Sequence, residues 1–141
     1  MEFLGYEFPE DLLYDNDLGW VKEEGAVITV GISDFFQKTA GEIIFIEIPV
    51  VGRKVEKGQP FASIESGKWV GRLKAPVNGE ITEVNSELSD FPYLLDESPY
   101  QDGWIAKIKV QDKGELQALH SPQDKAAFEQ FVQAEKDKYQ K

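Results

Sequence analysis

Turn signals divide the middle of the chain into short segments, and this restricts its fold more than any other sequence feature. Combinations of glycine, proline and asparagine that end strands recur at Lys57–Pro60, Ser66–Lys68 and Asn78–Gly79. The segments between them are rich in β-branched and aromatic residues and are too short for stable helices. This pattern favours many short strands, and Asn78–Gly79 is predicted to be a tight hairpin turn.

The apolar runs between these turns predict the strands. The run Ile43–Ile48 has only Glu47 as a polar residue, so we expect it to be buried on both faces. Trp104–Val110 alternates apolar and polar residues, which predicts a strand with one buried face. Residues 88–99 contain two prolines and several acids, so a loop is expected there. The other predicted strands are Val27–Ile32, Phe61–Ile64 and Val70–Val77.

Two helices are predicted. Ser33 is a suitable N-cap for a short helix over residues 34–40, which Gly41 would end. Ser121-Pro122 would open a longer helix over about residues 122–139, because proline suits the first helical position. Four of its residues fall on one stripe at helical spacing, namely Phe128, Phe131, Val132 and Glu135. We therefore expect a mainly β or α+β domain that spans residues 1–141 and ends in an α-helix.

The composition excludes several kinds of chemistry. The 141 residues include no cysteine and one histidine, so disulfides, thiolate metal sites and sites built from several histidines are excluded. His120 itself is expected to be a solvated loop residue. The net charge of −11 disfavours binding to nucleic acid or to anionic membranes. The longest apolar run, within Ile43–Val51, is too short to span a bilayer, and we expect a soluble cytoplasmic protein.

The pair Gly67-Lys68 is the strongest candidate for chemistry. A phosphate-binding loop is excluded, because Ala62 stands where its first glycine is needed and Trp69 follows the lysine instead of Ser or Thr. Between two strands, Lys68 would lie at a hairpin tip with its amine in water. An ordinary solubilising turn lysine is the alternative.

Longer motifs around this lysine resemble the glycine-cleavage H-protein family over residues 12 to about 135. Gly41–Pro49 with Gly52 is similar to a sheet segment of that family, and Glu65-Ser66-Gly67-Lys68 to its lipoyl-attachment site, usually Glu-Ser-Val-Lys. The stretch Ala75–Ile81 follows at the family's spacing. Further matches are Asn85, Leu94, Pro99-Tyr100 and Gly103-Trp104.

The resemblance implies a lipoyl-type β-barrel sandwich, or barrel-sandwich hybrid, with lipoate joined to Lys68 as an amide. Glu65, Ser66, Gly67 and Trp69 would flank the attachment site and help a lipoate-protein ligase or lipoyl transferase to recognise it. Gly67 is also expected to supply backbone freedom at the turn. The chain would be a monomeric, non-catalytic carrier whose arm is visited by partner enzymes, among them dihydrolipoyl dehydrogenase. Its acidic surface suggests that these partners have basic docking faces.

The chain departs from the family at the residues that bind the cargo. The family's His-Glu-Trp stretch corresponds to Leu18, Gly19 and Trp20, and its aspartate four residues after the lipoyl lysine corresponds to Arg72. A glycine and a cation thus replace acids that would pair with the ammonium of an aminomethyl cargo. Asp17 is close enough in sequence to compensate, so Asp17, Trp20 and Arg72 are the candidate residues of the cargo cleft.

A second resemblance indicates a different cargo. Glu65–Gly71 together with Phe8–Leu12 resembles the lipoate-binding proteins of the heterodisulfide-reductase-like sulfur-oxidation system. Arg72 and Lys74 would suit an anionic sulfur cargo. Our main functional prediction is therefore a lipoyl carrier of sulfur intermediates and electrons for a heterodisulfide-reductase-like complex. The alternatives are a glycine cleavage H protein, which carries the aminomethyl group from the decarboxylase to the aminomethyltransferase, and a binding module without an arm.

Overall fold

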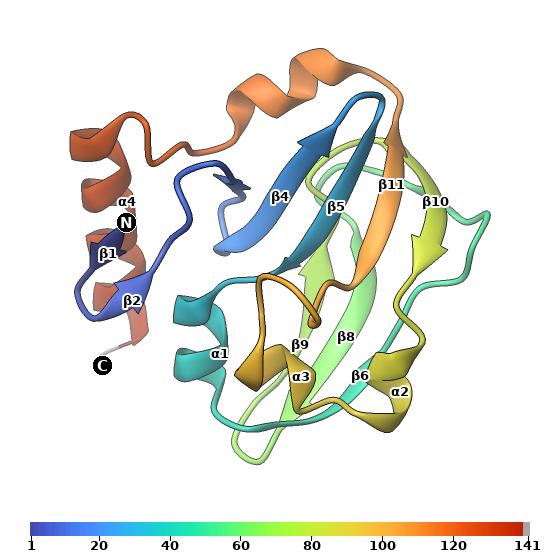
Figure 1. The fold of residues 1–141 in the computed structure, drawn as a ribbon, viewed down its shortest axis with the longest axis horizontal. Helices are drawn as coiled ribbons and strands as arrows, with labels where there is room; N and C mark the ends of the chain where they lie inside the picture. The colour runs from blue at the N-terminus through green and yellow to red at the C-terminus, as the bar shows by residue number, and fades with distance from the viewer. Residues whose placement is uncertain (140–141) are drawn as a thin grey trace.

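The computed structural model describes residues 1–139, which form β-sheets with a few helices (Figure 1). The largest sheet has six antiparallel strands in the order β3-β4-β5-β11-β10-β7. These strands are β3 (Leu13–Tyr14), β4 (Gly19–Glu24), β5 (Val27–Ile32), β7 (Lys54–Val55), β10 (Gly79–Val84) and β11 (Ala106–Val110). As predicted, β11 alternates, with Ala106, Ile108 and Val110 buried.

A second sheet completes the sandwich. Its three antiparallel strands, in the order β6-β8-β9, are β6 (Ile43–Glu47), β8 (Pro60–Ser66) and β9 (Val70–Lys74). Ile46 and Ile64 from this sheet join Ile28 and Ile108 from the larger one in a single buried cluster. The core therefore lies between the two sheets, and β8 and β9 form a hairpin whose tip is free of the larger sheet (Figure 1).

Of the short helices, α1 (Asp34–Ala40) connects the two sheets, whereas α2 (Glu87–Asp90) and α3 (Leu94–Glu97) lie between two strands of the larger sheet. Helix α1 is confirmed, because Ser33 Oγ accepts a hydrogen bond from the Phe36 amide at 3.1 Å and Gly41 follows with φ of 86°. The segment predicted as a loop contains α2 and α3, while η1 (Lys113–Ala118) is a 3-10 helix. Four-residue helices show no periodicity in sequence; buried Leu88 and Leu95 anchor these two.

The C-terminal helix α4 (Lys125–Tyr139) begins three residues later than predicted. The residues that were expected to open it form a turn, in which the Asp124 amide donates to the Ser121 carbonyl at 3.1 Å. The predicted stripe is confirmed: Phe128 and Val132 pack in a second buried cluster that covers one end of the larger sheet. Strands β1 (Glu2–Phe3) and β2 (Tyr6–Glu7) lie beside α4 (Figure 1). No helix in residues 1–139 is long and apolar enough to cross a membrane.

The prediction that Ile43–Ile48 is buried on both faces is wrong. Ile43 and Ile46 are buried, but Ile44 is 56% exposed and Phe45 is 48% exposed. The core lies between the two sheets, so only one face of β6 meets it. A register shift between Ile43 and Phe45 leaves two consecutive side chains in solvent.

Asn78–Gly79 is not a hairpin turn either. Here the chain passes from β9 in the smaller sheet to β10 in the larger one, so no hairpin joins them. Asn78 Oδ1 accepts from the Lys57 amide at 2.8 Å, and Gly79 already pairs with Val55 and Val110. The dipeptide matches a local turn preference, but long-range pairing decides its conformation.

Candidate functional site

Lys68 lies at the tip of the β8–β9 hairpin, and its side chain is exposed. Glu65 pairs with Val70 as the last strand pair, and the Ser66 amide donates to the Trp69 carbonyl at 2.8 Å. Gly67 and Lys68 are therefore the two residues of a tight turn. Ser66 is buried, and its hydroxyl oxygen accepts a hydrogen bond from the Lys68 amide at 3.3 Å. This hydrogen bond stabilises the turn. The lysine thus stands on a rigid base.

Gly67 does not play the role predicted for it. Its backbone lies outside the left-handed region, and a Cβ added there would meet nothing within 4 Å. Because the turn needs no glycine at this position, the expected demand for backbone freedom is wrong. Gly67 therefore contributes an open surface beside Lys68 and no special conformation.

Gly41, predicted to end a helix and to begin a family-like sheet segment, lies against the lysine. A Cβ at this position would come within 3.0 Å of Lys68 Cε, and within 3.8 Å of Cγ. Because Gly41 has no side chain, the methylene groups of Lys68 have space to lie against the end of α1. Gly41 also has φ of 86°, so any other residue there would be strained as well as crowded.

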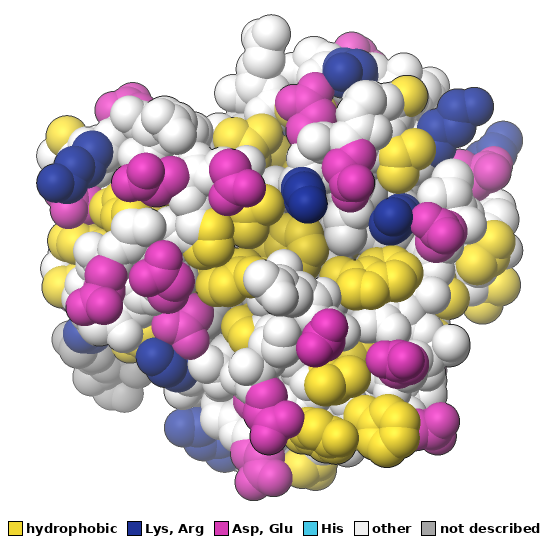
Figure 2. Space-filling view, viewed as in Figure 1, with side chains coloured by type: hydrophobic (Ala, Val, Ile, Leu, Met, Phe, Trp, Pro, Cys, Tyr) yellow, Lys and Arg dark blue, Asp and Glu magenta, His cyan; other side chains and the backbone are white. Residues whose placement is uncertain are grey.

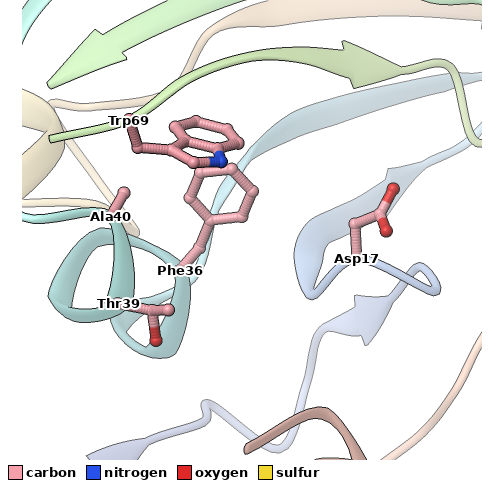
Figure 3. A pocket seen from close by; sticks show the side chains of 5 residues that line it. All are labelled: Asp17, Phe36, Thr39, Ala40 and Trp69. Carbon is pink, nitrogen blue, oxygen red and sulfur yellow. The ribbon is translucent and has the colours of Figure 1, made fainter. Parts of the chain in front are cut away.

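A cavity of about 60 Å³ opens next to this stem, between α1 and the hairpin. It is lined by Asp17, Phe36, Thr39, Ala40 and Trp69. Figure 3 shows the Trp69 and Phe36 rings against each other, with Asp17 across the opening on the neighbouring loop. The two rings make an edge-to-face contact, with centroids 5.4 Å apart and planes at 81°. Phe36, Thr39 and Ala40 were not singled out from the sequence, since the Ser33 cap predicts a helix but not which face meets the hairpin.

Trp69 reaches this cavity because Gly71 carries no side chain. A Cβ at Gly71 would come within 2.2 Å of the Trp69 indole, which therefore lies over the strand backbone. Trp69 is half-buried, in contrast to exposed Lys68 beside it. Trp69 was predicted to help recognition; in the structure it is the wall of a cavity.

The loop before β4 places Asp17 at the cavity. Asp15 Oδ1 accepts hydrogen bonds from the amides of Asp17 and Gly19, each at 2.9 Å. Buried Leu18 anchors the loop with φ of 62°. The adjoining cavity, of about 130 Å³, is lined by Asp15, Asp17, Lys57 and Lys74 among others. We call the first cavity the aromatic cavity, because Phe36 and Trp69 line it. The second cavity continues from it as a groove that contains two acids and two lysines.

The Pro99-Tyr100 pair links β4, the strand that follows the Asp17 loop, to the start of α1. Trp20 Nε1–H donates to the Pro99 carbonyl at 2.7 Å, and the Asp34 amide donates to Tyr100 Oη at 2.9 Å. Tyr100 Oη in turn donates to the Glu7 carbonyl. Burial raises the pKa of Tyr100, so its hydroxyl remains a donor at neutral pH.

Two of the three cargo-cleft candidates are brought together, because Asp17 and Trp20 both line a small cavity of about 20 Å³. Asp17 lines the aromatic cavity, but Trp20 is buried behind it at 2% exposure. Arg72 lies exposed in the middle of β9, opposite Ser63, and lines none of the cavities described here. Its neighbour Lys74 does reach the groove. Arg72 and Lys74 share the exposed face of β9, and only Lys74, the last residue of the strand, reaches the groove.

His120 is half-buried, and the prediction of a solvated histidine is wrong. Its ring stacks on Phe131 with centroids 3.7 Å apart, and Nε2 lies 2.8 Å from Asn16 Oδ1. Burial lowers the pKa of His120, which favours the neutral ring. The Tyr14 amide donates to the His120 carbonyl at 2.8 Å, so this residue braces the loop that carries Asp17.

Asp15→Asn is expected to remove a pH-dependent loss of stability. Burial raises the pKa of Asp15 in the folded chain from 3.8 to about 6. The folded chain therefore binds the carboxyl proton of Asp15 more tightly than the unfolded chain does. The stabilising contribution is full below about pH 4 and is lost as the pH rises through 6. Asparagine keeps the Oδ1 acceptor without the charge. We expect the variant to melt above the wild type at pH 7 and close to it at pH 4.

Thermal unfolding followed by circular dichroism between pH 4 and pH 8 measures this effect. Asp90→Asn, which removes an exposed charge on α2, serves as the control and should show no such pH-dependent gap. A melting difference for Asp15→Asn that stays constant over this pH range would contradict the assignment.

Known proteins that are similar to the chain agree with one another. The family model described as Glycine cleavage H-protein matches residues 12–134. A glycine cleavage system H protein from Anaeromyxobacter sp. (strain K) is 42% identical over 127 residues, which cover 90% of this chain and 97% of that protein. A mitochondrial one from Flaveria trinervia is 43% identical over 119 residues, covering 84% of this chain and 72% of that protein.

A solved structure shares the fold. A glycine cleavage system H protein from Mycobacterium marinum superposes with a TM-score of 0.76 and 29% sequence identity, over 85% of this chain and 97% of that chain. This confirms the predicted barrel-sandwich fold. The matched proteins named here give no support to the sulfur-oxidation prediction, and they favour its glycine cleavage alternative.

Proposed function

The chain belongs to the glycine cleavage H-protein family, and we propose that it carries lipoate on Lys68 for the glycine cleavage system. Proteins of this family carry lipoate covalently on a lysine. The observation that supports Lys68 is its position, exposed at the tip of a tight turn in a hairpin. The motif Glu65-Ser66-Gly67-Lys68 supports the same lysine from the sequence.

The residues around Lys68 suit a lipoyl arm that is attached to the protein at one end only. Gly41 leaves the space through which the lysine stem passes, and Ser66 holds the turn. A carrier needs this combination, since a rigid base presents the free end to several enzymes. When bound, lipoate supplies a dithiolane that is reduced and oxidised again.

We propose that the chain is a carrier and that its partners perform the reactions. The proposed partners are a lipoate-protein ligase or lipoyl transferase, glycine decarboxylase, the aminomethyltransferase and dihydrolipoyl dehydrogenase. Acidic side chains are spread over the face seen in Figure 2, and the net charge is −11. Basic docking faces on the partners would therefore speed encounter. A monomeric state, a cytoplasmic location and a single domain over residues 1–141 remain predictions from the sequence.

A row of side chains next to the turn is the proposed contact for these partners. Phe45 pairs with Glu65, and Glu65 pairs with Val70, so the three lie side by side across the smaller sheet. Phe45 is 48% exposed and Val70 is 69% exposed. An enzyme that binds around Lys68 would also contact this row, and Glu65 gives the row a negative centre.

Glycine turnover tests the proposal. In an assay reconstituted from the three partner enzymes, we expect the lipoylated chain to support decarboxylation in proportion to its concentration. Unlipoylated chain should support none, because its lysine alone offers no dithiolane. Release of labelled carbon dioxide from glycine measures the rate. A fully lipoylated chain that gives no turnover would contradict a role in glycine cleavage.

Transport of sulfur intermediates for a heterodisulfide-reductase-like complex is the second candidate function. Its support is that Lys57 and Lys74 line the groove beside Asp17, with exposed Arg72 two residues before Lys74. Cations of this kind suit anionic sulfur compounds. A lipoylated chain that is inactive with glycine but gains sulfur mass from an anionic sulfur donor would favour this candidate.

A further inference from the structure

The loop that joins α2 and α3 presents two aromatic side chains to solvent. Phe91 and Tyr93 are each 46% exposed, and their rings meet edge to face with centroids 5.9 Å apart. Figure 2 shows hydrophobic side chains over α2 and α3, with acidic side chains around them. Exposed aromatic side chains inside a polar rim are typical of a surface that binds another protein. We use the name α2–α3 patch for these two residues together with the exposed acids of the two helices, Glu87, Asp90 and Glu97.

The backbone holds the aromatic pair in place. The Phe91 amide donates to the Glu87 carbonyl at 2.8 Å, and the Leu94 amide donates to the Phe91 carbonyl at 3.1 Å. Buried Leu88 and Leu95 anchor the helices on either side. Side chains that are already fixed lose little conformational entropy when a partner covers them, so this pair is suited to binding.

The chain segments that build this surface carry negative charge only. Residues 75–106 include no lysine or arginine, and neither do residues 39–52, which contain the neighbouring strand β6. Two copies of the chain that met through the patch would therefore bring acids against acids, and anionic lipids or nucleic acid would be repelled as well. A protein face with lysine or arginine side chains around an apolar recess has the complementary charge. The acids of residues 75–106 are Glu80, Glu83, Glu87, Asp90, Asp96, Glu97 and Asp102.

The patch lies at the same end of the molecule as Lys68. Helix α2 lies against β6, and the Ile43 amide at the start of β6 donates to Asp96 Oδ2 of α3 at 3.0 Å. Ile43 also pairs with Ser66, two residues before Lys68 in the hairpin. The α2–α3 loop and the tip of the β8–β9 hairpin both lie at the lower end of the view in Figure 1. An enzyme that takes up the arm of Lys68 must therefore approach the end of the molecule that carries the patch.

We propose that the α2–α3 patch is a docking surface for a partner enzyme that takes up the Lys68 arm, and that this enzyme presents an apolar recess bordered by basic side chains. Phe91 and Tyr93 supply the apolar contact, and the acids around them steer the encounter. The inference rests on the proposed function, and it adds a second contact to the row of side chains proposed above. The patch residues line none of the three cavities described above.

The concentration dependence of glycine turnover tests this surface. The partner enzymes are held constant, and the fully lipoylated chain is varied to obtain its KM and kcat. We expect Phe91→Ser and Tyr93→Ser each to raise the KM about three- to tenfold and to change kcat less than about twofold, because both residues act in docking and not in the reaction. Unlipoylated wild-type chain should inhibit turnover competitively, and unlipoylated Phe91→Ser should inhibit about three- to tenfold more weakly.

Two further variants separate docking from folding and from general surface effects. Ser89→Lys places a cation on the exposed side of α2 without removing a packed side chain, and like charge on the partner should raise the KM about two- to fivefold. Val50→Ser changes a valine that is 71% exposed beyond the far end of β6, and it should leave the KM unchanged. Thermal unfolding and intact mass confirm that each variant is folded and fully lipoylated.

Two results would overturn the inference while the proposed function stands. One is a wild-type KM in folded Phe91→Ser, Tyr93→Ser and Ser89→Lys chains that still support glycine turnover. The other is a Val50→Ser chain whose KM rises as much as that of Phe91→Ser, which would show that the effect is not specific to the patch. A fully lipoylated wild-type chain without turnover would instead overturn the proposed function, and the inference with it.

Discussion

Replacing Lys68 by arginine is expected to abolish lipoylation while leaving the fold intact. Amide formation needs an amine that can lose its proton, and a guanidinium keeps its charge at every accessible pH. Because Lys68 is exposed at a turn, the substitution should change the free energy of unfolding by less than about 0.5 kcal/mol. Intact-mass spectrometry after co-expression with a lipoate-protein ligase measures the modification.

Lys74→Arg provides the matched control. Lys74 is another exposed lysine of the same hairpin, on β9, and its replacement should leave lipoylation complete. Equal thermal unfolding curves for both variants would show that a loss at position 68 has a chemical cause. A Lys68→Arg chain that takes up lipoate like the wild type would place the arm on another lysine.

Gly79→Ala is expected to destabilise the chain by about 1–3 kcal/mol, because the added methyl group has no space. A Cβ at this position would come within 2.2 Å of the Lys109 carbonyl oxygen and 2.7 Å of Ile108 Cγ2. The first of these is backbone of β11, which cannot move without disturbing the pairing of Gly79 with Val110. Urea unfolding at neutral pH measures the free energy.

Gly67→Ala separates this effect from the general cost of losing a glycine. A Cβ at Gly67 meets nothing within 4 Å, and its backbone is not left-handed, so we expect a change within about 0.5 kcal/mol. If Gly79→Ala and Gly67→Ala gave similar urea unfolding curves, this result would contradict the close approach of β10 and β11 at Gly79.

Sequence patterns that depend only on neighbouring residues, such as a helix cap or an alternating strand, mostly predicted the secondary structure correctly. The Ser33 cap and Gly41 predicted α1 to the residue, because a cap satisfies amides within one turn of helix. The alternation in Trp104–Val110 predicted the buried face of β11. By contrast, the proline after Ser121 suggested an early start for α4, where the structure has a turn before Lys125.

Predictions that depended on distant neighbours failed or stayed incomplete. Ile44 and Phe45 look like core residues in sequence, but β6 is an edge strand with a register shift. Asn78–Gly79 has the composition of a hairpin turn, yet the chain there passes between two sheets. In both cases the partner strand lies far away in sequence, so the local pattern carries no information about it.

The sequence by itself determined the family and the candidate lysine, since these rest on short motifs of neighbouring residues, one of them around Lys68. Only the tertiary structure decided what surrounds that lysine. Asp17, Phe36 and Trp69 come from a loop, a helix and a hairpin that meet because both sheets bury their apolar faces in one core. Packing of this kind joins residues without regard to their distance along the chain, which is why the cavity beside Lys68 could not be predicted from the residues that line it.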